Sequence, residues 1–347
     1  MPNGQQMETR ETNRLIRNLI AFVWMIAVCC GLGALTSNQS QSAGKTPDSQ
    51  KTAQKQFRTP QEAAEALIEA AGVYNVSELE QILGPTGEDL VSSEDPVRDK
   101  SIAVAFAAMA REKHAVDIDP ENPARATLSV GDDKWPLPIP IVKRNGKWIF
   151  DTKAGRQEML FRRIGANELD AIEICRGYIE AQKEYSLEKH DGAQVNQYAQ
   201  RIISTPGKHD GLVWRNSDGT LQGPISDEIA KALAEGYSDR SQPYHGYYFK
   251  ILKGQGPAAR LGQMDFVIEG AMIGGVALAA APAEYRVTGV KTFIVDYDGI
   301  VYEKDFGPNT LQNFRSMDRF NPDKTWKPTN AGWPPSVFDS DATTETR

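Results

Sequence analysis

The amino-terminal segment constrains this chain more than any other feature of the sequence. Residues 19–35 (LIAFVWMIAVCCGLGAL) are almost purely apolar, and Arg10, Arg14 and Arg17 precede them. A basic leader followed by such an apolar run is typical of a secretory signal peptide, or of a short membrane anchor whose amino end stays in the cytoplasm. We therefore expect the rest of the chain to fold on the far side of a membrane.

The length of the apolar run does not separate these two fates. Seventeen apolar residues lie at the lower limit for spanning about 30 Å of hydrocarbon, yet a cleaved leader usually has fewer. Ala34-Leu35-Thr36 is a poor cleavage site, which favours a retained anchor with the membrane as a partner through residues 19–35. Lipidation of Cys29 is a third alternative.

The charge balance excludes one class of function. Lys and Arg number 39 against 46 Asp and Glu, so the formal net charge is −7. Nucleic-acid binding depends on clustered cations that contact phosphates. We expect no nucleic-acid partner.

Cysteine usage excludes a disulfide framework. Cys29 and Cys30 lie inside the apolar run, which leaves Cys175 as the one cysteine of the exported part. An intrachain disulfide therefore cannot form there. Cys175 lies in an amphipathic helical pattern, and we expect it to be buried as a small apolar side chain.

The pattern beyond the leader predicts two α+β units. Residues 36–56 are polar and lack any apolar period, which is typical of a disordered linker. We expect an amino-terminal α+β domain over residues 57–160 and a carboxy-terminal α+β domain over residues 161–320. Residues 321–347 are rich in Pro, Trp and Thr and predict an extended tail, in which Trp326 and Trp333 pin the chain to the body.

The first unit is predicted to place helices before an antiparallel sheet. Helix caps are expected at Thr59 and Ser77, and a third helix after Asp95-Pro96. Asn145-Gly146 predicts a tight hairpin. Alternating residues predict strands over 114–119, 125–131, 139–143 and 147–151. This order, with a sheet that ends in Gly-Lys-Trp-Ile-Phe-Asp, resembles the cone-shaped NTF2-like modules.

The second unit is predicted to be a long helix followed by an antiparallel sheet. The helix is expected to begin at Asn167 and to end near Gly192, and a shorter helix is expected over residues 226–235. The buried face of the long helix is expected to hold Leu169, Ile172, Cys175 or Ile174, Ile179 and Tyr185. Strands are expected over 247–252, 276–281, 290–296 and 300–306, with a tight turn at Asp296-Tyr-Asp-Gly299.

Three stretches resemble one uncharacterised family. They are Arg163-Ile-Gly-Ala-Asn-Glu168, which leads into Ala181-Gln182 and Tyr185, then Tyr244-His-Gly-Tyr-Tyr-Phe-Lys-Ile-Leu252, and Gly289-Val-Lys-Thr-Phe-Ile-Val-Asp-Tyr-Asp-Gly-Ile-Val-Tyr302. Together they are similar to the family of bacterial envelope proteins catalogued as domain of unknown function 2950, over about residues 57–321. The resemblance implies an envelope protein, and the leader predicts a location in the periplasm, on the outer face of the inner membrane or outside the cell. It implies no activity.

The last two stretches are also similar to the strands that follow the long helix in type II pseudopilins. Those proteins carry a Gly-Phe-x-x-x-Glu processing motif before an apolar helix, and this chain has none there. The apolar run is also separated from Asn167 by a whole domain. We therefore do not expect a filament subunit.

Several short patterns admit a functional and a structural interpretation. Gly254-Gln-Gly-Pro-Ala-Ala259 fits a dinucleotide-binding turn, but an early glycine, Gly262, favours a flexible loop. Asn216-Ser-Asp-Gly219 and Asp296-Tyr-Asp-Gly299 resemble parts of calcium loops, although turn chemistry explains both. Tyr244, Tyr247, Tyr248 and Phe249 suggest a sugar-stacking surface, although burial in a sheet is simpler.

The function predicted from the sequence is therefore a structural or interaction module of the cell envelope. The chain has no G-x-x-x-x-G-K-[ST], G-x-S-x-G or H-E-x-x-H motif, and its four histidines are scattered. We assign no catalytic, cofactor-binding or metal-binding residue and expect an envelope protein as the partner. The alternative is an envelope hydrolase whose site is assembled from distant segments, with His245, Asp296 and Asp218 as the groups to bring together.

Overall fold

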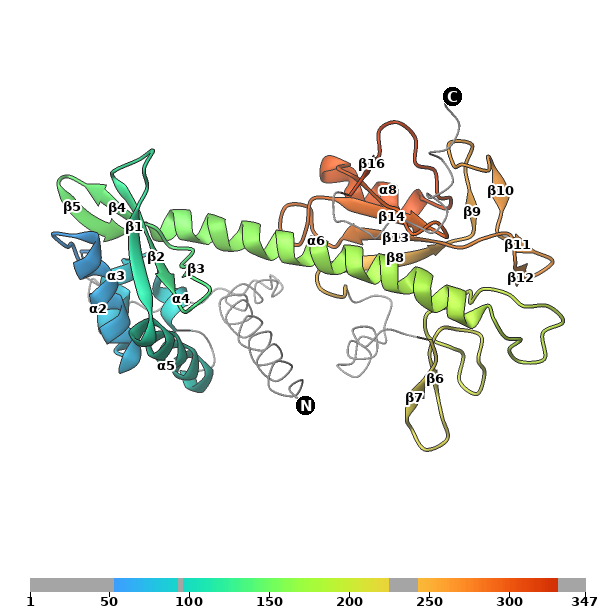
Figure 1. Ribbon diagram of the computed structural model, residues 1–347, viewed down its shortest axis with the longest axis horizontal. Coiled ribbons are helices and arrows are strands. Elements are labelled where there is room, and N and C mark those ends of the chain that lie inside the picture. Colours follow the sequence, from blue (N-terminus) through green and yellow to red (C-terminus); the bar gives the residue numbers. More distant parts are fainter. Residues whose placement is uncertain (1–52, 93–95, 225–242, 330–347) are drawn as a thin grey trace, which may run out of the picture. The chain divides into compact units, whose positions relative to one another are not determined.

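The computed structural model describes residues 53–92, 96–224 and 243–329 (Figure 1). The chain has an α+β fold and divides into two compact units, residues 1–161 and 162–347, which are described separately below. The apolar run at 19–35 and the helix expected over 226–235 lie outside the described residues. Within the described ranges, no helix has the length and apolar character needed to cross a bilayer.

The first unit packs helices against an antiparallel sheet, as predicted. The sheet has the order β1-β2-β4-β5, and β3 pairs with β2. The elements are α2 (Pro60–Gly72), α3 (Val76–Leu83), α4 (Glu88–Val91), α5 (Pro96–Glu112), β1 (His114–Ile118), β2 (Arg125–Val130), β3 (Trp135–Pro136), β4 (Ile141–Arg144) and β5 (Lys147–Phe150). The short strand β3 carries Pro136 and has one neighbouring strand, which agrees with an edge position for a proline that lacks an amide donor.

Helix caps follow the sequence in α2 but not in α3. Thr59 accepts a hydrogen bond from the Glu62 amide at 3.1 Å, as predicted. The predicted cap at Ser77 is wrong, because α3 begins at Val76 and the side chain of Asn75 accepts from the Glu78 amide at 3.2 Å. Asn is as good a capping residue as Ser, and here it comes first along the chain.

The start of the fold is tied to the sheet before the first helix. Gln54, which the sequence placed in the linker, donates to the backbone oxygens of Ile82 at 3.0 Å and Phe150 at 2.8 Å. Phe57 pairs with Trp148 of β5. The β4–β5 hairpin turns through Asn145 and Gly146, both at positive φ, as a two-residue turn of this kind requires.

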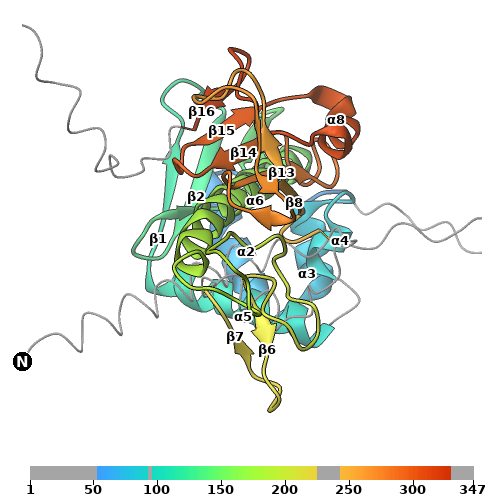
Figure 2. The same ribbon diagram turned by 90° about the vertical axis from the view of Figure 1, so that its right-hand side faces the viewer.

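Unit two contains a five-stranded antiparallel sheet and several short hairpins. The sheet has the order β16-β15-β14-β13-β8, which Figure 2 shows from one end. The elements are β6 (Trp214–Arg215), β7 (Leu221–Gln222), β8 (Tyr247–Leu252), β9 (Gly254–Gln255), β10 (Met264–Asp265), β11 (Val267–Ile268), β12 (Ala271–Met272), β13 (Ala277–Pro282), β14 (Thr292–Asp296), β15 (Val301–Lys304), η1 (Gly307–Asn309), α8 (Thr310–Ser316) and β16 (Lys327–Pro328).

The four main strands and the turn at Asp296 agree with the prediction. Strand β13 lies between β8 and β14, and all six of its residues are buried. Four of them are alanines, whose small side chains let neighbouring elements approach a central strand closely. Gly274 and Gly275 precede this strand, and a Cβ on Gly275 would lie 2.7 Å from the Phe266 ring.

The long helix begins earlier and ends earlier than predicted. Helix α6 (Thr152–Tyr185) contains the boundary between the two units, and its first turn is capped by Asp151, whose carboxylate accepts from the Ala154 amide at 3.1 Å. Asn167 cannot cap a helix that is already formed before it. The chain leaves the helix at Tyr185, and a turn at Asp191-Gly192 follows with both residues at positive φ.

The buried face of α6 is also shifted from the one predicted. Ile172, Cys175, Ile179 and Tyr185 are buried as expected, but Leu169 is 60% exposed. Leu169 lies outside the stripe that enters the core. The residues of this stripe recur at helical spacing: Ala171, Ile172, Cys175, Tyr178, Ile179 and Gln182. Burial raises the pKa of the Cys175 thiol, so this cysteine is an unreactive core residue.

One buried amide holds the loop that follows α6. Gln182 is fully buried, and its side chain donates to the Ala199 backbone oxygen at 2.8 Å and accepts from the Ala199 amide at 2.8 Å. It also donates to the Tyr178 hydroxyl at 3.0 Å. The loop therefore gains an anchor without secondary structure of its own.

The first part of the predicted tail belongs to the sheet. Trp326 is 9% exposed and packs on the core, as expected, with the Phe306 ring 5.6 Å away. Strand β16 then pairs with β15. Trp333 lies outside the described residues.

Replacing Gln182 by Ala is expected to lower the free energy of unfolding by about 3 kcal/mol, because it leaves the buried Ala199 amide and carbonyl unsatisfied. The measurement is urea unfolding followed by circular dichroism. Gln200 is the matched control, since its amide bonds Gly270 at an exposed position, and Gln200→Ala should change stability by less than about 0.5 kcal/mol. Equal losses for the two variants would contradict the anchoring role of Gln182.

Candidate functional site

The three stretches that carry the family resemblance meet in the second unit. Residues 163–170 of α6, the turn at 244–247 and the loop at 287–291 are joined by hydrogen bonds between their side chains and backbones. We call this meeting point the motif junction. It is the candidate site on which the distinctive residues of the sequence converge.

One face of α6 supplies polar side chains to the motif junction. Arg163, Asn167 and Asp170 are spaced at i, i+4 and i+7, so they lie on the same side of the helix. Arg163 donates to the Val287 backbone oxygen at 3.0 Å, and Asn167 donates to the Thr288 backbone oxygen at 2.8 Å. These bonds hold an irregular loop that lies between strands β13 and β14 in the chain.

Glu168, which follows Asn167 in α6, binds backbone amides of the same loop. The Glu168 carboxylate accepts from the amides of Val290 at 2.9 Å and Lys291 at 3.0 Å. Tyr247 completes the clamp by donating to the Lys291 backbone oxygen at 2.9 Å. A Cβ on Gly289 would overlap the Tyr247 hydroxyl at 2.2 Å, so glycine is required for this approach.

The turn before β8 holds the most unusual backbone of the junction. His245 and Gly246 have φ of 45° and 74°, and Tyr244 and Tyr247 exchange backbone hydrogen bonds of 2.8 and 2.9 Å across them. This two-residue turn favours Asn-Gly, so a histidine at its first central position is a less favourable choice for the backbone. The imidazole Nδ1 lies 2.7 Å from an Asp170 carboxylate oxygen, and the ring stacks on Tyr244 at 4.0 Å.

An imidazole beside a carboxylate is also the supporting half of a catalytic triad, but the neighbouring hydroxyl is engaged elsewhere. Thr288 adjoins the turn, since a Cβ on Gly246 would lie 2.7 Å from the Thr288 Cβ. The Thr288 hydroxyl donates to the Glu284 backbone oxygen at 3.2 Å and accepts from its amide at 3.0 Å. A nucleophile must instead be bonded to its base. The Thr288 hydroxyl is therefore not placed as a nucleophile for His245.

The aromatic run in this region is mostly structural. Tyr247 is 1% exposed, and burial raises the pKa of its hydroxyl. Tyr248 and Phe249 are half-buried and pack on the core. Tyr244 stacks on His245, so these four rings do not form the continuous sugar-stacking surface that the sequence suggested.

The three groups named for an enzyme are not brought together. Asp296 lies at the end of β14 and is paired with Ala277, which is paired with Leu252 at the end of β8. His245 precedes the start of β8. His245 and Asp296 therefore lie at opposite ends of the sheet. Asp218 lies in the separate β6–β7 hairpin.

Among the described residues of the second unit, Asp296 has the most perturbed carboxyl group. Burial, with a further contribution from the neighbouring Asp298 carboxylate, raises its pKa to about 6. Burial and these two carboxylates also raise the pKa of Tyr302. Arg260 pairs with Asp298, its Nε lying 3.3 Å from the carboxylate, so the turn holds one ionised pair beside a carboxyl that takes up a proton readily.

The two turns that resemble calcium loops use their oxygens internally. Asp218 accepts from the amide and the hydroxyl of Thr220 at 2.9 and 2.6 Å. Asp296 accepts from the Asp298 amide at 3.2 Å. Over the described residues, no group of three or more His, Cys, Asp or Glu side chains is arranged to hold a metal ion.

The glycine-rich loop after β8 packs against another part of the chain. A Cβ on Gly254 would lie 2.5 Å from Arg319, and a Cβ on Gly256 would lie 2.5 Å from Asn321. The loop runs between the antiparallel strands β9 and β10. Its glycines thus permit a close approach of the chain, and a nucleotide-binding turn would instead open a helix.

Two of the four histidines lie beside one tryptophan, although all four are far apart along the sequence. The His209 and His190 rings lie 4.5 and 6.0 Å from the Trp214 ring, and His190 stacks on Tyr185 at 3.9 Å. Burial, with contributions from the carboxylates of Asp191 and Asp210, raises the pKa of Tyr185 to about 12. This cluster packs the loop against the end of α6.

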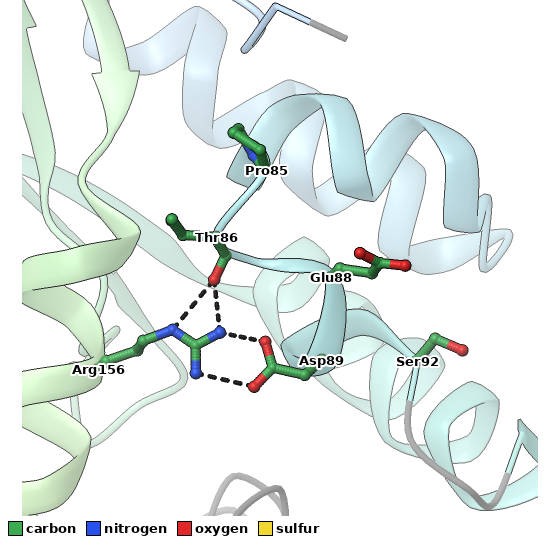
Figure 3. A pocket seen from close by; sticks show the side chains of 6 residues that line it. All are labelled: Pro85, Thr86, Glu88, Asp89, Ser92 and Arg156. Carbon is green, nitrogen blue, oxygen red and sulfur yellow. Dashed lines mark hydrogen bonds and ion pairs between the residues drawn. The ribbon is translucent and has the colours of Figure 1, made fainter. Parts of the chain in front are cut away.

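The first unit has an open hollow of about 530 Å³ beside α4 (Figure 3). The Arg156 guanidinium donates to the Thr86 backbone oxygen at 3.0 Å and binds both carboxylate oxygens of Asp89. The hydrogen bonds from Arg156 hold the pKa of Asp89 below its usual range. The cation that would attract an anionic ligand is thus engaged in fastening α4 to α6. The lining residues are Pro85, Thr86, Glu88, Asp89, Ser92 and Arg156.

The sequence contained a signal for part of the motif junction. Arg163, Asn167 and Asp170 are polar and recur at helical spacing. A helix predicted to start at Thr152 would have placed all three on one of its faces. The pairing of Asp170 with His245 spans 75 residues and has no local signal.

Comparisons with known proteins extend the resemblance to most of the chain. A family model described as a protein of unknown function, DUF2950, matches residues 54–329, as predicted. No curated protein and no solved structure gives a significant match. The resemblances to NTF2-like modules and to type II pseudopilins stay predictions.

Replacing Asp296 by Asn is expected to stabilise the protein above pH 7. A folded-state pKa of about 6 against 3.8 unfolded means that Asp296 contributes stability below pH 4 and loses it as the pH rises through 6. An uncharged asparagine at this position would avoid the burial of a charge, and the free energy of unfolding should rise by up to about 3 kcal/mol. Thermal unfolding from pH 4 to 8 would measure this gain. The exposed Asp218→Asn serves as control and should show no such gain; an Asp296→Asn effect that does not vary with pH would contradict the raised pKa.

Proposed function

The chain belongs to the DUF2950 family of proteins of unknown function, and we propose that it is an exported protein of the bacterial cell envelope that acts through contacts with other molecules. In this proposal it is a structural or interaction module without catalytic activity. Its site of action is the periplasm or the outer face of the inner membrane, or the medium if the leader is cleaved.

The observation that carries the non-enzymatic part is the use of polar groups at the motif junction. Asn167 and Glu168 bind the backbone of the 287–291 loop, and Asp170 binds His245. The residues that carry the family resemblance thus serve to hold loops in place. Such a scaffold suits a protein whose loops present a fixed surface.

The export part is supported by the basic leader and the apolar run at residues 19–35. In the part of the chain that the structure describes, which starts at residue 53, Gln54 makes the first anchoring contact, and the sequence of residues 36–53 is polar, as a spacer between the two would be. An anchored form of the protein would stand on this spacer beside the membrane.

The envelope hydrolase is the second candidate, and one observation favours it. Asp296 has a pKa of about 6 beside the ionised pair of Asp298 and Arg260, and a carboxyl group that carries a proton near neutral pH is what general acid catalysis needs. Against it, His245 and Asp218 lie elsewhere in the second unit.

Cell fractionation tests the export part of the proposal. The full chain is expected in the envelope fraction, whereas Val23→Asp with Ile26→Asp should leave it in the cytosol, because two charges interrupt the apolar run. Leu187→Asp is the matched control, since it adds a charge in the folded part at a residue that is 75% exposed, and it should not alter the location. Wild-type protein found wholly in the cytosol would contradict export.

Turnover of cell-wall material separates the two candidates. Purified full-length protein incubated with isolated, dye-labelled cell wall is expected to release no more soluble dye than buffer alone. Release that is abolished by Asp296→Asn, with Asp218→Asn unchanged, would replace the interaction module by the hydrolase.

A further inference from the structure

One end of the second unit exposes a group of large apolar side chains. They belong to the loop before β10, the β11–β12 hairpin and the turn between β14 and β15, and Figure 1 shows the short strands β9 to β12 together at one end of the sheet. Their exposed fractions range from 45% to 72%. We call this set the apolar end: Leu261, Ile268, Ile273, Tyr297 and Ile300.

The β11–β12 hairpin presents its apolar residues outward by strand alternation. Val267 packs on the core and Met272 is fully buried, and these two residues are paired across the hairpin. Ile268 is paired with Ala271 and therefore lies on the opposite, outer face, together with Ile273. The hairpin contacts the core through Val267 and Met272, and its two isoleucines on the outer face stay exposed.

Direct contacts join the segments of the apolar end. Tyr198 donates its amide to the Met272 backbone oxygen at 2.8 Å, and its ring lies 6.3 Å from the Tyr297 ring, edge to face. Arg260 pairs with Asp298 at 3.3 Å, which places Leu261 beside the turn that carries Tyr297. The three segments that carry the exposed side chains therefore lie next to one another.

The apolar end carries charges of both signs, and Glu269, in the turn of the β11–β12 hairpin, adds an exposed carboxylate. Arg260 and Asp298 supply one charge of each sign, with side-chain exposures of 75% and 37%. The Lys183 ammonium of α6 lies 4.6 Å from the centre of the Tyr297 ring. Tyr297 belongs to the turn that also holds the Asp296 carboxyl. An exposed ion pair of this kind contributes little to the stability of one chain, so both partners are available to a second surface.

We propose that the apolar end is the contact between two copies of this chain. In a two-fold interface the same surface meets itself, so it has to hold both partners of every ion pair. The apolar end does so, because Arg260 of one copy would face Asp298 of the other and the reverse. Its tyrosine, arginine and aliphatic side chains are those that suit the centre of a protein interface.

The net charge of the chain also bears on how two copies can meet. With a net charge of −7, two copies repel each other over most orientations. A contact through the apolar end would offset part of this repulsion, because it buries apolar side chains and lets Arg260 of each copy meet Asp298 of the other. This inference names a partner for the interaction module proposed above and rests on that proposal only for its biological meaning.

Sedimentation of the purified full chain in mild detergent tests the contact. The wild type is expected at twice the mass of one chain, and Leu261→Glu or Ile273→Glu should weaken association at least tenfold. Val73→Glu is the matched control, since Val73 is 70% exposed in the first unit, and it should leave the dimer intact. All three variants retain the apolar run at residues 19–35, so association through that run would persist in all of them and contradict the proposal.

A charge exchange tests the orientation of the two copies. Arg260→Asp alone and Asp298→Arg alone should each sediment as single chains, because every facing pair then has one sign. Mixing the two variants should restore the dimer, since each then supplies the charge that the other lacks. A wild type that stays a single chain at about 100 μM would overturn the proposal and leave the surface to a different protein, whereas failure of export would show only in the fractionation experiment.

Discussion

The satisfaction of backbone groups by side chains of α6 is the interaction on which the second unit depends. Its sheet is joined by long irregular segments, and buried backbone groups without partners are costly. Glu168 accepts from two successive amides of the 287–291 loop, and Gln182 takes both backbone groups of Ala199. One helix thus orders two loops while its apolar stripe fills the core.

Much of the fold was predictable because its signals are local. The cap at Thr59, the Asn145-Gly146 turn and the alternating strands depend on neighbouring residues, and the structure confirms them. The start of α6 was missed because Asp151 was assigned to the end of a strand, although it also caps the helix. The motif junction could be predicted only in part, since the contact of His245 with Asp170 depends on the tertiary fold.

The candidate sites of both units have a common feature. Arg156 in the hollow beside α4 is bonded to Asp89, and the Thr288 hydroxyl near His245 is bonded to Glu284. These two groups, a guanidinium and a hydroxyl, are thus engaged in fastening a short helix and a loop. The exposed apolar side chains at the end of the second unit are the contrasting case, because the fold does not use them, and this contrast underlies the proposal of a protein that works by contact.

The position of the unit boundary inside α6 has a consequence for dissecting the protein. A recombinant fragment starting at Arg162 would open in the middle of a helix, with about four backbone amides lacking acceptors and without the Asp151 cap. A fragment ending at Phe161 would in turn leave the last carbonyls of a helical stub unpaired. Fragments that keep residues 151–185 whole therefore suit the study of either half better than a cut at the boundary.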